Sequence, residues 1–144
     1  MRSFHYDPTL LSLFNKVGDF HKAFKVDENK QFGTIDAQTA ALRYKLLQEE
    51  NLEYLNACAL MDKVQIADAL TDMLYVLIGT MRAHGFDKLV YNCFAEVHRS
   101  NMSKLDSNGE VILREDGKIM KSENYTKPSL QSIIFQYDDE FGPK

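Results

Sequence analysis

Hydrophobic residues recur every three or four positions over four long stretches of the chain, and this period predicts helices. The stretches cover about residues 7–24, 36–60, 62–85 and 87–104. Each begins at an aspartate, which favours the N-cap position, and the first aspartate is followed by a proline suited to the first helical turn. We therefore expect four helices.

The pattern changes after the fourth stretch. Two short extended segments, 111–113 and 118–121, flank Asp116-Gly117, a dipeptide that favours a two-residue hairpin turn. Residues 129–137 can form one more short helix or an extended tail. These features predict a small β-hairpin followed by an irregular C-terminal tail.

The predicted elements indicate an all-α fold. We expect a four-helix bundle over about 7–104, with the hairpin and tail over about 105–144. The chain has 144 residues and a mass of 16.6 kDa, a size typical of one domain. We therefore expect residues 1–144 to form a single domain.

Composition and charge exclude several classes of protein. The 17 Lys and Arg against 21 Asp and Glu give a net charge of −4, so we do not expect binding to a nucleic-acid polymer. Cys58 and Cys93 lie far apart in apolar sequence, which disfavours a disulfide scaffold or a zinc–thiolate site. The first residues form no apolar run suited to a signal peptide or membrane span. We expect a cytoplasmic protein with no membrane partner.

Acidic residues interrupt the apolar face of the second predicted helix. Steps of three and four residues place Glu50 and Glu53 on one face with Leu46 and Ala57. Glu49 precedes them, which gives an EExxE pattern. Such a pattern alone is usually a solvated surface, so its meaning depends on the next helix.

The third predicted helix is apolar on almost every side. Between Val64 and Thr80 the charged residues are Asp68 and Asp72, four positions apart and therefore on one face. A buried carboxylate is costly unless it is paired, and the span contains no Lys or Arg. A partner helix could supply Arg43 or Lys45.

A divalent cation between the two acidic helices reconciles these patterns better. Ligation by carboxylates alone suits Mg²⁺, with Mn²⁺ as a substitute, and neither helix has the histidine spacing of a di-iron bundle. Mg²⁺ sites are commonly shared with substrate phosphates, which indicates phosphate chemistry with a metal-activated water.

Several motifs together resemble the all-α nucleoside triphosphate pyrophosphohydrolase superfamily, which includes MazG-like proteins, dimeric dUTPases and phosphoribosyl-ATP pyrophosphohydrolases. These motifs are EExxE, IADALTDMLYVLIG, VHRSNMSKL, REDGKIMK and NYTKPSL. The likeness extends over roughly residues 10 to 130. The resemblance implies a MazG-like helical bundle that hydrolyses a nucleoside triphosphate between the α and β phosphorus atoms.

The superfamily pattern is ExxE on one helix and ExxD on the next, and four acids bind Mg²⁺. Glu50 and Glu53 match the first half. If Asp72 is the family aspartate, Ala69 occupies the glutamate position and Asp68 stands one residue earlier. If Asp68 is that aspartate, Gln65 takes the glutamate position. We prefer the first alignment, because Gln65 can instead complete a capping box at the start of the helix.

The resemblance assigns further candidates. Glu50, Glu53, Asp68 and Asp72 would bind the metal, and Glu49 would orient or deprotonate the attacking water. Cations and polar groups would hold the substrate phosphates and nucleoside: Arg99, Asn101, Lys104, Lys118, Lys121, Tyr75 and His21. Individually these residues also have ordinary structural roles, such as a surface lysine or a core tyrosine.

Two other interpretations stay open. The acidic helices could form a non-catalytic interaction module that pairs with a basic partner, or the chain could be a phosphoribosyl-ATP pyrophosphohydrolase, although its long C-terminal part argues against the latter. The third helix is apolar on more sides than three neighbouring helices can cover. We therefore expect a homodimer, or a dimer of dimers, with helix faces at the interface.

Overall fold

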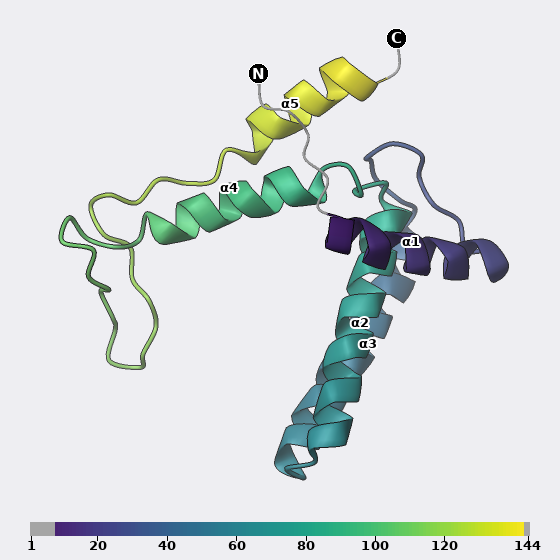
Figure 1. The fold of residues 1–144 in the computed structure, drawn as a ribbon, viewed down its shortest axis with the longest axis horizontal. Helices are drawn as coiled ribbons and strands as arrows, with labels where there is room; N and C mark the ends of the chain where they lie inside the picture. The colour runs from purple at the N-terminus through teal and green to yellow at the C-terminus, as the bar shows by residue number, and fades with distance from the viewer. Residues whose placement is uncertain (1–7, 143–144) are drawn as a thin grey trace. The chain divides into compact units, whose positions relative to one another are not determined.

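The computed structural model describes residues 8–142, and these form helices joined by turns and loops (Figure 1). The helices are α1 (Pro8–Ala23), α2 (Ala37–Ala59), α3 (Lys63–Ala83), α4 (Val90–Met102) and α5 (Leu130–Phe141). Residues 8–142 contain no β-strand. The expected all-α class is confirmed, and the first three helices lie within a few residues of their predicted bounds.

The chain is arranged as two compact units. Helices α1, α2 and α3 belong to the first, which ends at Lys88, and α4 and α5 belong to the second, which continues from Leu89. The four helices expected in one bundle are thus divided between the units. That these four helices form one bundle, and that residues 1–144 form one domain, stays a prediction.

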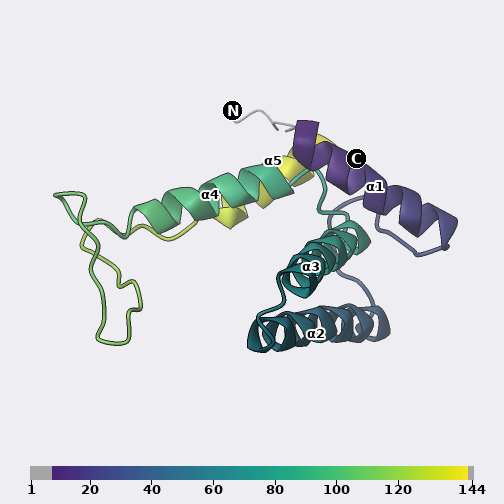
Figure 2. The same cartoon turned by 60° about the horizontal axis from the view of Figure 1, so that its bottom comes forward.

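In the first unit α2 and α3 form an antiparallel pair, and α1 packs against α3 (Figures 1 and 2). Local capping explains where two of these helices begin. The Asp36 carboxylate accepts a hydrogen bond from Thr39 N at 2.9 Å, and the Asp62 carboxylate accepts from the backbone N–H groups of residues 64 and 65. The Gln65 amide donates to Asp62 Oδ2 and so supports the cap, but the Asp62 N–H donates to the Ala57 carbonyl, so the reciprocal bond of the predicted capping box does not form.

The helix pair buries mainly small residues and leaves most of its large apolar side chains exposed, although Ile78 on α3 is buried. Ala57 and Ala69 are 2% and 3% exposed, which lets the two backbones approach closely. Many larger apolar side chains of the pair remain exposed: Leu42, Tyr44, Leu52, Leu55, Leu60, Val64, Leu70, Leu74 and Leu77. The isolated first unit therefore has an apolar surface that a soluble protein normally covers.

Helix α3 is long and apolar enough to cross a membrane by length and composition alone. The core helix of a soluble bundle has the same properties, and α3 packs against both α1 and α2. It also carries Asp68 and Asp72 in mid-helix. These features fit a bundle helix.

The predicted β-hairpin is wrong. Around Gly117, which has a φ of +82°, a single isolated antiparallel bridge joins Leu113 and Ile119, and no strand forms. Both side chains are more than half exposed. A two-stranded ribbon without a packed face is marginal, and this segment has none. Residues 103–125 therefore form a long, mostly exposed loop between α4 and α5, which we call the excursion.

Two further predictions at the ends of elements need correction. Helix α4 begins at Val90 and its N-cap is Leu89, so Asp87 lies in the preceding turn and does not cap it. Of the two alternatives for residues 129–137, the short helix is confirmed and the irregular tail is wrong, because α5 occupies Leu130–Phe141. The predicted cap at Asp7 lies outside the described residues.

Candidate functional site

The register between α2 and α3 places the acidic residues of one helix beside those of the other. Arg43 on α2 donates hydrogen bonds to Thr80 and to the Val76 carbonyl on α3. Two turns further along α2, Glu50 interacts electrostatically with Asp72. We call the facing residues between these two contacts, 43–50 on α2 and 72–80 on α3, the α2–α3 seam.

Glu50 is the centre of the acidic cluster. Its Oε2 atom is buried and is the side-chain oxygen for which the described residues provide no hydrogen-bond partner. Burial raises the pKa of the Glu50 carboxyl, and the nearby negative charges raise it further, in the decreasing order Glu53, Asp72, Glu49 and Asp68. Every acid selected from the sequence therefore acts on this one carboxylate.

The other acids differ in their exposure. Asp72 is partly buried, whereas Glu49, Glu53 and Asp68 are exposed. Ala69, the position where the superfamily pattern has a glutamate, points into the helix packing and is 3% exposed. Asp68 lies one residue earlier and on the accessible side. This placement is compatible with Asp68 and Asp72 as the acids of the second helix.

The acidic side chains as positioned do not form a closed metal cage. Among residues 8–142 no group of three or more Asp, Glu, His or Cys side chains lies close enough to hold an ion. The donor set nevertheless fits Mg²⁺, which retains several waters and needs few protein carboxylates. The unpartnered Glu50 Oε2 is compatible with this fit, because a buried carboxyl without a donor is neutralised either by a proton or by a cation.

The alternative in which a basic residue neutralises the acids of α3 is not observed. Within residues 8–142 neither Arg43 nor Lys45 forms an ion pair with Asp68 or Asp72. The hydrogen bonds of Arg43 go to Thr80 Oγ1 and the Val76 carbonyl instead. The acidic cluster thus lacks an internal counter-charge in the described chain.

His21 belongs to a buried polar network at the other end of α3. It is 3% exposed, and its Nδ1 lies 2.8 Å from Glu28 Oε1. Arg82 binds both oxygens of Glu28, at 2.6 and 2.8 Å. An open groove of about 720 Å³ passes His21, Glu28 and Arg82. Burial is the main cause that lowers the pKa of His21, and Glu28 partly opposes it.

Sequence reasoning missed Glu28 and Arg82. Glu28 lies in a polar loop without a period, and Arg82 stands in the last turn of α3, where a basic residue commonly complements the helix dipole. Tyr75, a predicted substrate residue, packs edge-on against Phe20 with ring centroids 5.7 Å apart. In this structure Tyr75 has the ordinary role of joining α1 to α3.

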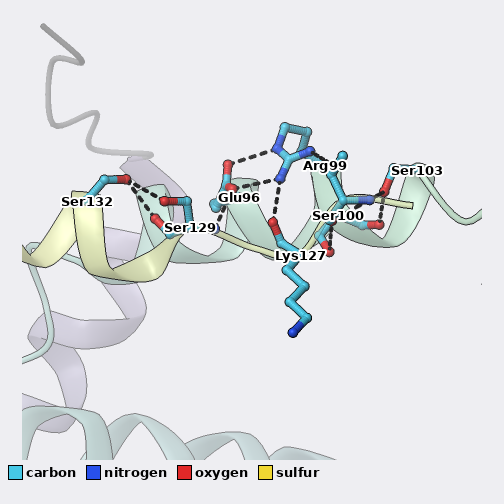
Figure 3. A network of polar contacts seen from close by, with 8 residues as sticks. Glu96, Arg99, Ser100, Ser103, Lys127, Ser129 and Ser132 are labelled. Carbon is cyan, nitrogen blue, oxygen red and sulfur yellow. Dashed lines mark hydrogen bonds and ion pairs between the residues drawn. The ribbon is translucent and has the colours of Figure 1, made fainter. Parts of the chain in front are cut away.

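In the second unit Arg99 fastens the chain after the excursion onto α4 (Figure 3). Its guanidinium binds both oxygens of Glu96, at 2.8 and 3.0 Å, and donates to Thr126 Oγ1 and the Lys127 carbonyl. Glu96, itself 3% exposed, also accepts from Ser129 N at the start of α5. We call Glu96, Arg99 and the segment 126–129 the α4 clasp.

The remaining predicted phosphate-binding residues also lie in the second unit. Lys104 Nζ donates to Asn101 Oδ1 at 2.8 Å, Lys121 stands 4.4 Å from the Tyr125 ring centroid, and Lys118 is exposed on the excursion. Lys104 and Asn101 are therefore brought together. That these phosphate-binding candidates act together with the acidic cluster of the first unit stays a prediction.

Comparison with known protein families decides the relationship. Residues 17–101 match the model of the family described as phosphoribosyl-ATP pyrophosphohydrolase. The chain belongs to this family. The family is part of the MazG-like nucleoside triphosphate pyrophosphohydrolase superfamily, so the resemblance expected from the motifs is confirmed. A comparison with curated proteins gives no significant match.

The family match includes some of the candidate site residues and leaves others outside. It includes the acidic cluster, His21, Tyr75, Arg99 and Asn101, together with the last seven of the 16 residues of α1 and nearly all of α4. Lys104, Lys118 and Lys121 lie beyond it. Family membership supports pyrophosphohydrolase activity, the hydrolysis of a phosphoric anhydride, in general terms.

Proposed function

We propose that this protein hydrolyses a nucleoside or deoxynucleoside triphosphate between the α and β phosphates, in a Mg²⁺-dependent reaction that yields a monophosphate and pyrophosphate. The observation that supports this most is the unpartnered, buried Glu50 Oε2 at the centre of the acids from two helices. A cluster of this kind destabilises the fold unless a cation joins it, and a Mg²⁺–triphosphate complex brings that cation.

Each acid has a role in this proposal. Glu50, Glu53, Asp68 and Asp72 would hold the Mg²⁺, with Mn²⁺ as a substitute. The bound ion would neutralise phosphate charge and lower the pKa of a coordinated water. Glu49, exposed on α2 next to Glu50, would orient the attacking water and accept its proton, while the bond from phosphorus to the bridging oxygen breaks and pyrophosphate leaves.

The substrate contacts are also proposals. His21 and Tyr75 would lie towards the nucleoside, since both belong to the packing of α1 against α3. Asn101, Lys104, Lys118 and Lys121 would bind phosphate oxygens. Arg99 would act mainly through the α4 clasp, because Glu96, Thr126 and Lys127 already accept its hydrogen bonds.

The family match favours a second candidate substrate, phosphoribosyl-ATP, which contains the same anhydride. Phosphoribosyl-ATP carries a phosphoribosyl group that a simple nucleoside triphosphate lacks, and the acidic cluster would serve both. The match ends at residue 101, before the excursion and α5. We favour a simple triphosphate because 41 of the 144 residues (102–142) belong to the described structure beyond the family core.

We also propose that the protein works in the cytoplasm as a homodimer or a dimer of dimers. The exposed leucines and tyrosines of α2 and α3 form an apolar surface on the acidic helix pair itself. A second copy would cover this surface and complete a helical bundle around the cluster.

A titration of thermal stability with Mg²⁺ tests the metal site and separates an enzyme from an acidic interaction module. We expect millimolar Mg²⁺ to raise the melting temperature of the wild type by several degrees, because the ion binds the folded state. Glu50→Gln should remove most of this increase. Glu140→Gln, an exposed acid on α5, should retain it. Equal responses of both variants would contradict the assignment of Glu50.

A further inference from the structure

Arg43 lies where three helices meet. Its Nε donates to Thr80 Oγ1 at 3.1 Å and its Nη2 donates to the Val76 carbonyl at 2.9 Å. A Cβ atom at Gly79 would collide with Arg43 Nη2 and would stand 3.1 Å from His21 Nε2. The missing side chain at Gly79 therefore lets the guanidinium of α2 lie against α3, beside the imidazole of α1.

The charge of Arg43 has no counter-ion in the described chain. Arg82, Arg99 and Arg114 each bind a carboxylate, whereas both acceptors of Arg43 are neutral. Burial lowers the pKa of the Arg43 guanidinium, which shows that its charge is partly removed from water. Only two of its five N–H groups take part in these hydrogen bonds. A partly buried guanidinium with free donors and neutral neighbours is well suited to bind an anion.

Arg43 and Glu50 occupy the same face of α2. They are seven residues apart, which corresponds to two helical turns and about 10 Å along the axis. One is a cation without an acid, and the other is a partly buried acid whose Oε2 atom is buried without a donor. The two side chains do not pair with each other. A ligand that carries a metal ion at one end and further negative charge along its length would satisfy both.

We propose that Arg43 is a substrate-binding residue that holds a phosphate group of the metal-bound polyphosphate, at the end of the α2–α3 seam opposite the acidic cluster. This inference rests on the proposed function and adds a phosphate contact within the first unit. Thr80 and the Val76 carbonyl position the guanidinium, and Glu28 holds the His21 ring beside it through Nδ1.

A structural role for Arg43 makes a different prediction. If Arg43 merely ties α2 to α3, the loss of its acceptor on α3 should have the same effect as the loss of its charge. Thr80→Val removes the hydroxyl with little change of shape and leaves the guanidinium in place. Arg43→Gln removes the charge, and Arg43→Lys keeps the charge without the planar fork.

The test is calorimetric binding of pyrophosphate in the presence of Mg²⁺ to the full-length wild type and the three variants. We expect Arg43→Gln to weaken binding at least about tenfold, because the variant loses charge-assisted hydrogen bonds to the phosphate oxygens. Arg43→Lys should lose about threefold or more, and Thr80→Val less than about twofold.

Three results would overturn the proposal: wild-type affinity in Arg43→Gln, an equal loss in Thr80→Val, or no pyrophosphate binding by the wild type. Circular dichroism checks the folding of each variant, and if Arg43→Gln does not fold, Arg43→Lys decides, with wild-type affinity as the contradicting result. Hydrolysis by the wild type is measured separately. If the wild type hydrolyses a triphosphate and Arg43→Gln binds pyrophosphate with wild-type affinity, the role of Arg43 alone is rejected. Pyrophosphate binding through Arg43 without hydrolysis of any triphosphate would reject the proposed function alone.

Discussion

The Arg82 guanidinium on α3 binds the Glu28 carboxylate in the loop after α1 through two parallel hydrogen bonds, Nε to Oε1 at 2.6 Å and Nη2 to Oε2 at 2.8 Å. The same Arg82 also donates to the Phe14 carbonyl on α1 at 3.1 Å. One side chain of α3 thus fixes both α1 and the loop that leads to α2. This arrangement orients His21, whose Nδ1 shares Glu28 Oε1.

The first prediction concerns this network. Glu28→Gln should lower the free energy of unfolding by about 2 kcal/mol, because it breaks a partly buried, charge-assisted pair and leaves Arg82 without its acid. Chemical denaturation followed by circular dichroism measures the change. The control is Glu140→Gln on α5, which should change stability by less than about 0.5 kcal/mol. A similar small effect for Glu28→Gln would show that the pair contributes little.

The second prediction is a pH dependence from His21. Burial outweighs the influence of Glu28 and holds the pKa of His21 below its usual 6.5. The unfolded chain therefore binds more protons than the folded one between 6.5 and the folded-state pKa. The free energy of unfolding should fall as the pH drops through this window. Below the folded-state pKa, protonation of His21 should cause no further change in it.

Titration of the His21 ring by NMR measures this pKa directly. We expect a value below 6.5 in the wild type and a still lower value in Glu28→Gln, since the variant loses the carboxylate that stabilises the imidazolium. The stability decrease between pH 7 and pH 5 should also be smaller in His21→Gln than in the wild type. A wild-type pKa above 6.5 would reverse the sign and contradict this account.

The helices and the acidic cluster could be predicted from sequence because local signals specify them. The 3.6-residue period identified α1, α2 and α3, and the caps Asp36 and Asp62 marked two of their starts. The same period placed Glu50 among apolar residues of α2, and its buried oxygen agrees with that interpretation. Acids in a stripe that should be apolar are a strong signal because burial makes them costly.

Tertiary contacts decided the features that the sequence did not predict. Asp116-Gly117 indicated a hairpin, but no packed face stabilises the flanking residues, and a single bridge remains. Glu28 and Arg82 are 54 residues apart, and no local pattern links them. Arg43 could be named from sequence as a partner for the acids, yet the register directs it to Thr80 and Val76 instead.

The third prediction concerns the α4 clasp. Glu96→Gln should weaken the hydrogen bonds that Glu96 accepts from the Arg99 guanidinium and from the Ser129 N–H. The segment 126–129 should therefore detach more often from α4. Hydrogen exchange should become at least about tenfold faster at the amides of Thr126 and Ser129. Glu115→Gln, an exposed acid of the excursion, is the matched control and should leave these rates unchanged. Unchanged exchange in Glu96→Gln would show that the clasp is held elsewhere.

The fourth prediction is the oligomeric state. Light scattering at micromolar concentration should give twice or four times the 16.6 kDa of one chain, because a second copy covers the apolar surface of α2 and α3. Leu55→Glu, at a side chain that is 62% exposed, should shift the protein towards the monomer. Lys45→Glu adds the same side chain at an exposed, already polar position of α2 and serves as the control. A wild-type monomer would contradict the dimer.

The most direct test of the central claim is product analysis after incubation with a panel of ribo- and deoxynucleoside triphosphates and phosphoribosyl-ATP in the presence of Mg²⁺. The account predicts monophosphate and pyrophosphate in equal amounts from at least one triphosphate, no reaction without a divalent cation, and a loss of at least about 100-fold in Glu50→Gln but not in Glu140→Gln. Release of orthophosphate alone, or full Mg²⁺-dependent turnover by Glu50→Gln, would contradict it.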